Sequence, residues 1–213
     1  LLHGRARNRT AVLKFAPGLH AAGYSLLLPD FPGHGESSPS PVTLGVLEKI
    51  AVRGMVGYLE SRHVEKIGIL GISMGGTSAI LAAAEDPRID VVVADSPYKN
   101  FVQIVGERGW EEYKIPSFPF KYTVSALAGM LYRFNPFDVD AARAAARIYT
   151  RGLMLIHGLR DTYVPKKHTE EVYQCARPPK ELWIVSGAKH GRSFDKDPDT
   201  YMKRILHFFK RHL

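Results

Sequence analysis

The sequence predicts an α/β protein with a mostly parallel sheet and helices on both faces of that sheet. Two observations predict this class. Five short apolar runs alternate with helical patterns, as they do in repeated strand–helix–strand units. The apolar runs are nearly continuous, which is typical of parallel strands that are covered on both faces. We expect these strands at residues 24–29, 66–72, 89–94, 152–157 and 180–186.

Helical patterns fill the segments around these runs, and we expect helices at 8–22, 43–62, 74–84, 166–176 and 199–211. Thr43 and Asp199 are the expected N-cap residues, because their short polar side chains accept hydrogen bonds from free N–H groups of a first helical turn. Asp86-Pro87 should close the helix that begins at Met74, since proline cannot continue a helix.

The chain of 213 residues, of which 45% are hydrophobic, is long enough for one domain with a sizeable core, and we expect a single domain over 1–213. One connection, between residues 94 and 152, is too long for a simple crossover and is rich in aromatic residues and proline. We expect an insertion at about 97–138. It is either a helical lid over a functional site or an ordinary pair of packing helices.

The formal net charge of +8 invites a nucleic-acid or membrane-surface interpretation. However, the basic residues are scattered, and their densest runs, Lys203-Arg204 and Lys210-Arg211-His212, lie in the last expected helix. We therefore expect a solvated basic surface and no nucleic-acid partner. No run of about 18 apolar residues exists, so the sequence predicts no membrane span in this chain.

Cys175 is the only cysteine, which excludes an intrachain disulfide and suits a reducing compartment. On this ground the cytoplasm is slightly favoured. The opening residues Leu1-Leu2-His3-Gly4 look like the end of a buried strand. We therefore expect the first strands of the sheet, with any targeting or anchor segment, to lie upstream of Leu1.

Ser73 lies in the segment Gly71-Ile72-Ser73-Met74-Gly75, between an expected strand and an expected helix. This strand–turn–helix context is that of a nucleophile elbow. The turn is so tight that the residues two positions before and after the serine must be very small, and Gly71 and Gly75 satisfy this. Ser73 would then project from the carboxyl end of the sheet at a helix N-terminus, where the helix dipole favours negative charge. A glycine-rich turn with a capping serine is the alternative.

A serine hydroxyl needs a base to take its proton, and His190 is the candidate. It follows the last expected strand, whereas five other histidines fall on expected helices or at their ends: His20, His63, His168, His207 and His212. The base needs a carboxylate to fix its tautomer. Asp161 follows the strand at 152–157 in a short, glycine-led turn and is favoured over Asp95, which follows the strand at 89–94 and could instead tie down a loop.

An oxyanion hole completes the predicted machinery, because backbone N–H groups stabilise the charge that develops in acyl transfer. One donor should be Met74, the residue after the nucleophile. The second should come from the loop at His3-Gly4-Arg5, where glycine allows the backbone to approach a substrate closely. On its own, the His3-Gly4 dipeptide is equally typical of a plain turn.

At this point the sequence resembles the α/β-hydrolase superfamily over essentially the whole chain. The order Ser73, Asp161, His190 is the chain order of that superfamily. Residues 3–9 resemble its oxyanion-loop motif, in which Asn and Arg follow His-Gly, and residues 30–37 resemble the loop after its fourth strand. The chain is similar to a bacterial branch of uncharacterised esterase-like hydrolases, in which a segment like Asp95-Ser96-Pro97-Tyr98 follows the sixth strand. The likeness implies an α/β-hydrolase fold without its first strands, Asp161 as the triad acid and Arg5 as the second oxyanion donor.

The sequence therefore predicts a serine hydrolase that cleaves carboxylic esters through an acyl-enzyme on Ser73. A small-molecule ester is the expected partner, and no metal or organic cofactor is expected. A peptidase, amidase or thioesterase of the same fold is the first alternative, because this fold carries all of these activities. A non-catalytic interaction domain on a hydrolase scaffold is the second.

Overall fold

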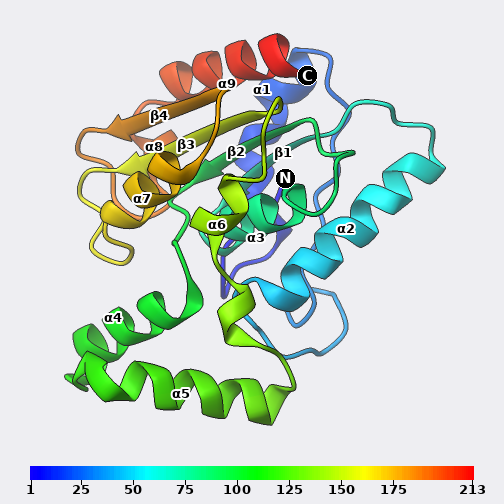
Figure 1. Ribbon diagram of the computed structural model, residues 1–213. Coiled ribbons are helices and arrows are strands. Elements are labelled where there is room, and N and C mark those ends of the chain that lie inside the picture. Colours follow the sequence, from blue (N-terminus) through cyan, green and yellow to red (C-terminus); the bar gives the residue numbers. More distant parts are fainter.

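A parallel sheet of four strands forms the centre of the protein, whose computed structural model describes residues 1–213 (Figure 1). The strands are β1 (Gly68–Ile72), β2 (Val91–Asp95), β3 (Gly152–Gly158) and β4 (Lys180–Val185), in that order across the sheet. Each strand pairs in parallel with the next. All four carboxyl ends therefore lie at one edge, and the predicted class and four of the five predicted strands are confirmed.

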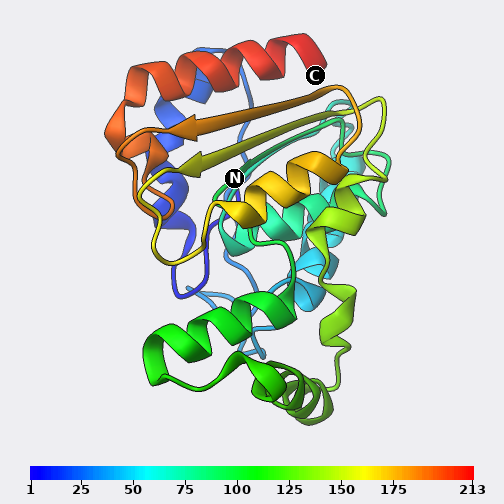
Figure 2. The same ribbon diagram turned by 60° about the vertical axis from the view of Figure 1, so that its left-hand side comes forward.

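Helices cover both faces of the sheet (Figure 2). One face carries α2 (Val46–Ser61), α3 (Met74–Ala83), α6 (Ala141–Ala145) and α7 (Lys167–Cys175). The other carries η1 (Arg9–Phe15), α1 (Ala16–Ala21), α8 (Ser193–Lys196) and α9 (Pro198–His212). The five predicted helices are all present, although the first consists of a 3₁₀-helix followed by a short α-helix. None of the helices combines the length and hydropathy that crossing a bilayer requires.

The core consists of two apolar clusters, one on each face of the sheet. Val92 and Leu153 point into the larger cluster, whereas their neighbours Val93 and Met154 point into the smaller one. All four side chains are almost completely buried. Because both faces are covered, successive residues of a strand are apolar, which explains the continuous apolar runs in the sequence.

The start of α9 differs from the prediction. Its N-cap is Asp197, whose carboxylate accepts the N–H of Thr200, and Pro198 occupies the first helical position. Proline is favoured there because its missing N–H would have no partner in the helix. Asp199 therefore lies inside the first turn, and its prediction as the N-cap was wrong.

The start of α2 also differs, because its N-cap is Gly45 and not Thr43. Thr43 nevertheless organises this end of the helix. Its hydroxyl accepts the N–H of Leu47 at 2.8 Å and donates to the buried carboxylate of Glu48 at 2.7 Å. Glu48 also accepts the N–H groups of Thr43 and Gly45. The carboxylate thus satisfies donors that the helix itself leaves free.

The strand predicted at residues 24–29 is absent, and that prediction was wrong. This segment lies beside the first two residues of the chain, where the terminal amino group of Leu1 donates to the carbonyl of Leu27. Leu2 in turn forms an isolated parallel bridge with Gly71 of β1. A strand needs a ladder of partners, and two residues provide only single bonds on that side.

Residues 97–138, the predicted insertion, contain α4 (Phe101–Tyr113), α5 (Ser117–Tyr132) and the 3₁₀-helix η2 (Pro136–Asp138). Figures 1 and 2 both show α4 and α5 side by side, at the end of the molecule opposite α9. Asn100 caps α4 by accepting the N–H of Gln103. The hairpin of α4 and α5 lies beyond the carboxyl ends of the strands, at the edge of the sheet where the loops that follow the strands come together.

Candidate active site

Ser73 occupies the turn between β1 and α3 in a left-handed conformation, with φ 53° and ψ −116°. Such a conformation strains a residue that has a Cβ, so the surroundings must impose it. The neighbouring glycines show how tight the turn is. A Cβ on Gly71 would lie 2.5 Å from the backbone of Gly75, and a Cβ on Gly75 would lie 2.5 Å from the carbonyl oxygen of Leu2. This geometry fits the nucleophile elbow that the sequence predicts.

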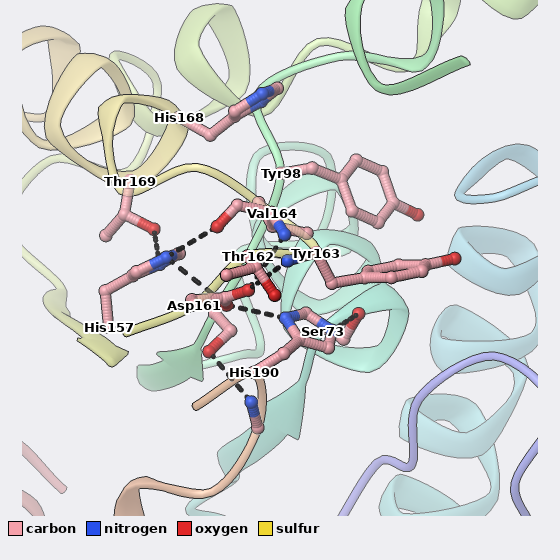
Figure 3. A network of polar contacts seen from close by, with 12 residues as sticks. Ser73, Tyr98, His157, Asp161, Thr162, Tyr163, Val164, His168, Thr169 and His190 are labelled. Atoms are coloured by element: carbon pink, nitrogen blue, oxygen red, sulfur yellow. Dashed lines mark hydrogen bonds and ion pairs between the residues drawn. The ribbon is translucent and has the colours of Figure 1, made fainter. Parts of the chain in front are cut away.

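The side chains of Ser73, His190 and Asp161 form a continuous hydrogen-bonded chain (Figure 3). Nε2 of His190 lies 2.9 Å from Oγ of Ser73, and its Nδ1 lies 2.6 Å from Oδ2 of Asp161. A carboxylate can only accept hydrogen bonds, so Nδ1 carries a proton and donates a hydrogen bond to Asp161. Nε2 of the neutral ring is then free to accept the hydroxyl proton of Ser73. The three residues come from loops after β1, β3 and β4, which end at the same edge.

The carboxylate of Asp161 is completely buried and is held from two sides. Its Oδ1 accepts the N–H groups of Tyr163 and Val164, each at 2.9 Å. Its Oδ2 lies 3.3 Å from Nε2 of His157 in addition to its bond with His190. Backbone donors stabilise the ionised carboxylate and fix its orientation toward His190.

His157, at the end of β3, is a buried support of this loop. Burial lowers the pKa of its imidazole, so the ring is neutral at neutral pH. Nε2 lies 2.9 Å from the carbonyl oxygen of Val164 and donates to it, whereas Nδ1 accepts the hydroxyl of Thr169 at 2.7 Å. The ring therefore fastens the loop that contains Asp161 to β3 and α7.

Asp95, the rival carboxylate from the sequence, does not contact His190. Its buried side chain accepts hydrogen bonds from the hydroxyls of Ser96, Ser193 and Tyr201. Burial raises its pKa to about 6 even with these three donors. Asp95 thus joins the end of β2 to α8 and α9, the loop-tying role that the sequence left open.

The loop at residues 3–5 runs beside the elbow. His3 is fully buried, and burial lowers its pKa. Its Nδ1 donates to the carbonyl of Gly4 at 2.8 Å and its Nε2 accepts the N–H of Phe31 at 3.0 Å. A Cβ on Gly4 would lie 3.4 Å from Cβ of Ser73, so the loop backbone passes close to the serine. The N–H of Arg5 donates to no group of the protein.

Asp30 connects this loop to the segment at 30–37. Its carboxylate accepts the side chain and the N–H of Arg9, at 2.5 and 2.6 Å, together with the N–H of Glu36 at 3.0 Å. These bonds lower the pKa of Asp30, although its burial alone would raise it. Gly35 faces the same carboxylate with φ +55°, and a Cβ there would lie 2.1 Å from Oδ2. The two motifs that the sequence analysis identified, at residues 3–9 and 30–37, are therefore parts of one loop structure.

A cavity of about 330 Å³ opens beside Ser73. Its walls come largely from α4 and α5, and its lining includes Met74, Tyr98, Ile104, Val105, Ile115, Phe120 and Val124. Four charged side chains also line it: Arg5, Arg108, Glu112 and Lys121. The cavity is therefore mostly apolar, and the nucleophile candidate lies in its wall. No group of three or more His, Cys, Asp or Glu side chains is arranged to hold a metal ion.

Comparison with known proteins identifies the family. A model of the Alpha/beta hydrolase family matches residues 1–204. The chain belongs to this family. The uncharacterized protein YqkD of Bacillus subtilis (strain 168) is 28% identical to this alpha/beta hydrolase over 212 residues, which cover 98% of the chain and 69% of YqkD.

A solved structure gives a closer functional comparison. The Pyrococcus furiosus esterase Pf2001 is 30% identical and has a TM-score of 0.80, covering 99% of this chain and 81% of its own. A 2-hydroxy-6-oxononadienedioate/2-hydroxy-6-oxononatrienedioate hydrolase of Cupriavidus pinatubonensis (strain JMP 134 / LMG 1197) is 38% identical over 91 residues, 41% of this chain and 31% of its own length. Family and neighbours together support a hydrolase.

Two residues that the sequence analysis did not single out join the helix α4 of this alpha/beta hydrolase to the site. The ring of Tyr163 lies 5.0 Å from that of His190, and its hydroxyl accepts a hydrogen bond from the side chain of Arg5 at 2.9 Å. The guanidinium of Arg108 lies 4.4 Å from the same ring. Arg108 also donates to the carbonyl oxygens of Thr162 and Tyr163. Only the position of Tyr163, two residues after Asp161, could have pointed to it.

Proposed function

We propose that this hydrolase is a serine esterase that cleaves carboxylic esters, with Ser73 as nucleophile, His190 as general base and Asp161 as the orienting acid. One observation carries the proposal: the hydrogen-bonded chain from Oγ of Ser73 through His190 to Asp161. A nucleophile within hydrogen-bond reach of a base, and a base oriented by a third group, is the arrangement that activates a serine hydroxyl. The 30% identity with an esterase supports the choice of ester bonds.

The first half of the reaction forms an acyl-enzyme. Oγ of Ser73 attacks the ester carbonyl carbon while Nε2 of His190 takes the hydroxyl proton. The imidazolium that results is stabilised by the carboxylate of Asp161. When the tetrahedral intermediate collapses, the bond to the alcohol oxygen breaks and His190 returns the proton to the leaving alcohol. The acyl group remains on Ser73.

The oxyanion of this intermediate needs two donors. Met74 is the first residue of α3, so its N–H has no helical acceptor and is available. The N–H of Arg5 donates to no group of the protein, and Gly4 allows the loop to lie close to Ser73. Each such donor contributes about 3 kcal/mol to the stabilisation of a tetrahedral intermediate. A water that His190 activates then hydrolyses the acyl-enzyme.

The cavity supports an apolar acyl or alcohol group. It is lined mainly by hydrophobic side chains, which recognise substrate by burial and not by many polar contacts. We assign the segment at 97–138 as a cap on this site, because α4 and α5 provide most of the cavity wall. No cluster of acidic side chains beside Ser73 marks an anchor for a peptide amino terminus, so an ester stands ahead of a peptide as substrate.

The proposal is tested by Ser73→Ala on short p-nitrophenyl esters. We expect kcat to fall about a thousandfold or more, because the oxyanion donors alone leave only residual catalysis. Ser78→Ala is the matched control. Ser78 lies in α3, the helix that follows Ser73, and is buried, but its hydroxyl has no hydrogen-bond partner, so its loss should leave the rate unchanged. Wild-type hydrolysis by Ser73→Ala would refute the nucleophile assignment.

A fluorophosphonate probe separates the enzyme from a non-catalytic interaction domain. The wild type should form a covalent adduct at Ser73, and Ser73→Ala should form none. Parallel assays with p-nitrophenyl esters, acyl thioesters and aminoacyl p-nitroanilides then rank the three hydrolase classes by kcat/KM. We expect the oxygen esters to rank first. If the wild type formed no adduct, the result would favour the non-catalytic interaction domain.

A further inference from the structure

The helix α5 buries small residues and exposes large apolar ones, which is the opposite of ordinary helix packing. The residues that it buries against the protein are small ones, Ser125 and Gly129. Its large apolar side chains point to solvent, and their exposed fractions are 77% for Phe118, 77% for Met130, 66% for Leu131, 55% for Tyr132 and 54% for Leu127. Burial of a large apolar side chain is the main favourable term in folding, so a helix normally does the reverse. This exposed surface is therefore not explained by packing within the chain.

The neighbouring end of α4 continues the surface. Trp110 is 50% exposed and Tyr113 is 71% exposed. Single exposed apolar residues are normal, but a group of this size on two adjacent helices marks an interaction surface. We call the exposed side chains of these residues the cap surface: Trp110, Tyr113, Phe118, Leu127, Met130, Leu131 and Tyr132. In Figures 1 and 2 it lies at the end of the molecule away from the sheet.

The charges that flank α5 have one sign, whereas Glu111 and Glu112 lie on the α4 side of the cap surface. The segment from Lys114 to Phe137 contains the cations Lys114, Lys121 and Arg133 and no aspartate or glutamate. Lys114 precedes α5 and Arg133 follows it, so a cation flanks each end of the apolar helix. An apolar face with flanking basic residues, together with tryptophan and tyrosine, is typical of a segment that lies in the interface of an anionic membrane.

The cap surface is continuous with the cavity beside Ser73. The same hairpin that exposes its large side chains outward also lines the cavity with Ile115, Phe120 and Val124. A bilayer in contact with this hairpin would therefore lie next to the cavity wall. We propose that the cap surface docks on an anionic lipid bilayer and that the ester substrate comes from the lipid phase, the second statement resting on the proposed function.

A second copy of this chain fits the cap surface less well. In a two-fold dimer that pairs α5 with α5, the flanking cations of both copies would be brought together, and α5 itself holds no acidic residue to compensate them, while Glu112 of α4 is already paired with Arg108. Like charges across an interface oppose association. An anionic lipid headgroup supplies the complementary charge, at about 1 kcal/mol for each lysine or arginine near the surface.

The test is co-sedimentation of the full chain with vesicles. We expect binding to vesicles of equal parts phosphatidylglycerol and phosphatidylcholine, at least tenfold stronger than binding to pure phosphatidylcholine, and weaker at high salt because salt screens surface charge. Lys114→Gln with Arg133→Gln should weaken binding about thirtyfold. These two residues do not line the cavity.

The apolar contribution is tested by Leu127→Gln, Met130→Gln and Leu131→Gln in one variant. None of the three lines the cavity, and we expect vesicle binding to fall at least tenfold. Leu13→Gln with Ile50→Gln is the matched control, because both side chains are 55% exposed and lie on other elements. The control should bind vesicles like the wild type. The charge variant, whose α5 is intact, still decides the question if the triple variant fails to fold.

Wild-type binding no stronger to anionic than to neutral vesicles would overturn the proposal. So would a dimer in solution that the triple variant converts to monomer without any binding to vesicles. Labelling of Ser73 by a fluorophosphonate in the absence of lipid tests the proposed function separately. A labelled protein that ignores vesicles refutes docking alone, and a protein that binds vesicles without a label refutes the esterase alone.

Discussion

The side chain of Arg108 and the backbone of Tyr163 are joined by a hydrogen bond of 3.0 Å, across 55 residues of sequence. Arg108 lies in α4, and Tyr163 lies two residues after Asp161. The next residue along α4 toward its start, Glu107, is bound to His168 and Lys167 at 2.6 and 2.7 Å. The cap helix is therefore fastened to the segment that carries the proposed triad acid. The position of Asp161 and the position of the cap are not independent.

Arg108→Met should lower kcat for p-nitrophenyl acetate about tenfold. The variant removes the donor to the carbonyls of Thr162 and Tyr163, so the loop of Asp161 loses a support and His190 is oriented less accurately. Acetate is too small to depend on the cavity wall, so the loss should appear in kcat and much less in KM. Steady-state kinetics with this ester measures both values.

Arg53→Met is the control for the loss of a helical arginine with an ion pair. Arg53 lies in α2 and contacts Glu85, which follows the end of α3, and neither residue lines the cavity beside Ser73. It should keep wild-type kinetics. Arg108→Lys should recover part of the loss, since lysine keeps the charge but not the planar fork. An unchanged kcat for Arg108→Met would show that α4 does not position the triad.

Asp161→Asn and Asp95→Asn should differ sharply in activity. Asparagine at 161 can no longer hold the proton on Nδ1 of His190, so kcat should fall about 10³- to 10⁴-fold. Asp95 does not contact His190, so its replacement should change kcat less than tenfold. The same p-nitrophenyl ester assay compares the two variants. Equal losses of kcat would make Asp95 as good a candidate for the triad acid as Asp161.

Much of the site could be predicted because its signals are local. The elbow needs Gly71 and Gly75 within two residues of Ser73, and the steric reason is visible in a short segment. His190 and Asp161 each follow a strand, and parallel strands bring such ends to one edge. The arrangement of strands was predictable for the same reason, since continuous apolar runs indicate coverage of both faces.

The parts that could not be predicted depend on contacts between distant segments. Residues 24–29 have the composition of a strand, but a strand also needs a backbone partner, and the bond from the terminal amino group of Leu1 to Leu27 forms no ladder. The exposure of α5 was equally invisible. Its sequence is apolar on all sides, so no periodic pattern shows which face is buried, and Ser125 and Gly129 became its inner face only through packing.

The buried carboxyl of Asp95 should make stability depend on pH. Its pKa is raised by burial from an ordinary value of 3.8 to about 6. Between these values the folded state binds more protons than the unfolded state, so stability falls as pH rises through this range. The full effect is roughly 3 kcal/mol, reached above pH 6. The hydroxyls of Ser96, Ser193 and Tyr201 oppose the shift, because their hydrogen bonds favour the ionised carboxylate.

Urea unfolding at pH 4 and pH 7.5, followed by tryptophan fluorescence, measures this effect. Asp95→Asn removes the titrating group but keeps one oxygen to accept from Ser96, Ser193 or Tyr201. The difference in free energy of unfolding between wild type and variant should shift in favour of the variant as pH rises from 4 to 7.5. Comparing the two chains cancels the other titrating groups. A constant difference across this range would show that Asp95 does not titrate there.

Gly75→Ala should destabilise the protein by about 3 kcal/mol and abolish esterase activity. The new Cβ would lie 2.5 and 2.6 Å from the carbonyl oxygens of Leu2 and His3, which are backbone atoms and cannot rotate away. Gly54→Ala in α2 is the matched control. A Cβ there meets nothing within 4 Å, and alanine is the better helix former, so this variant should gain about 0.5–1 kcal/mol. Urea unfolding of both variants measures the contrast. If Gly75→Ala were as stable and active as Gly54→Ala, the close approach of Gly75 to the backbone of Leu2 and His3 would not be what holds Ser73 in its strained turn.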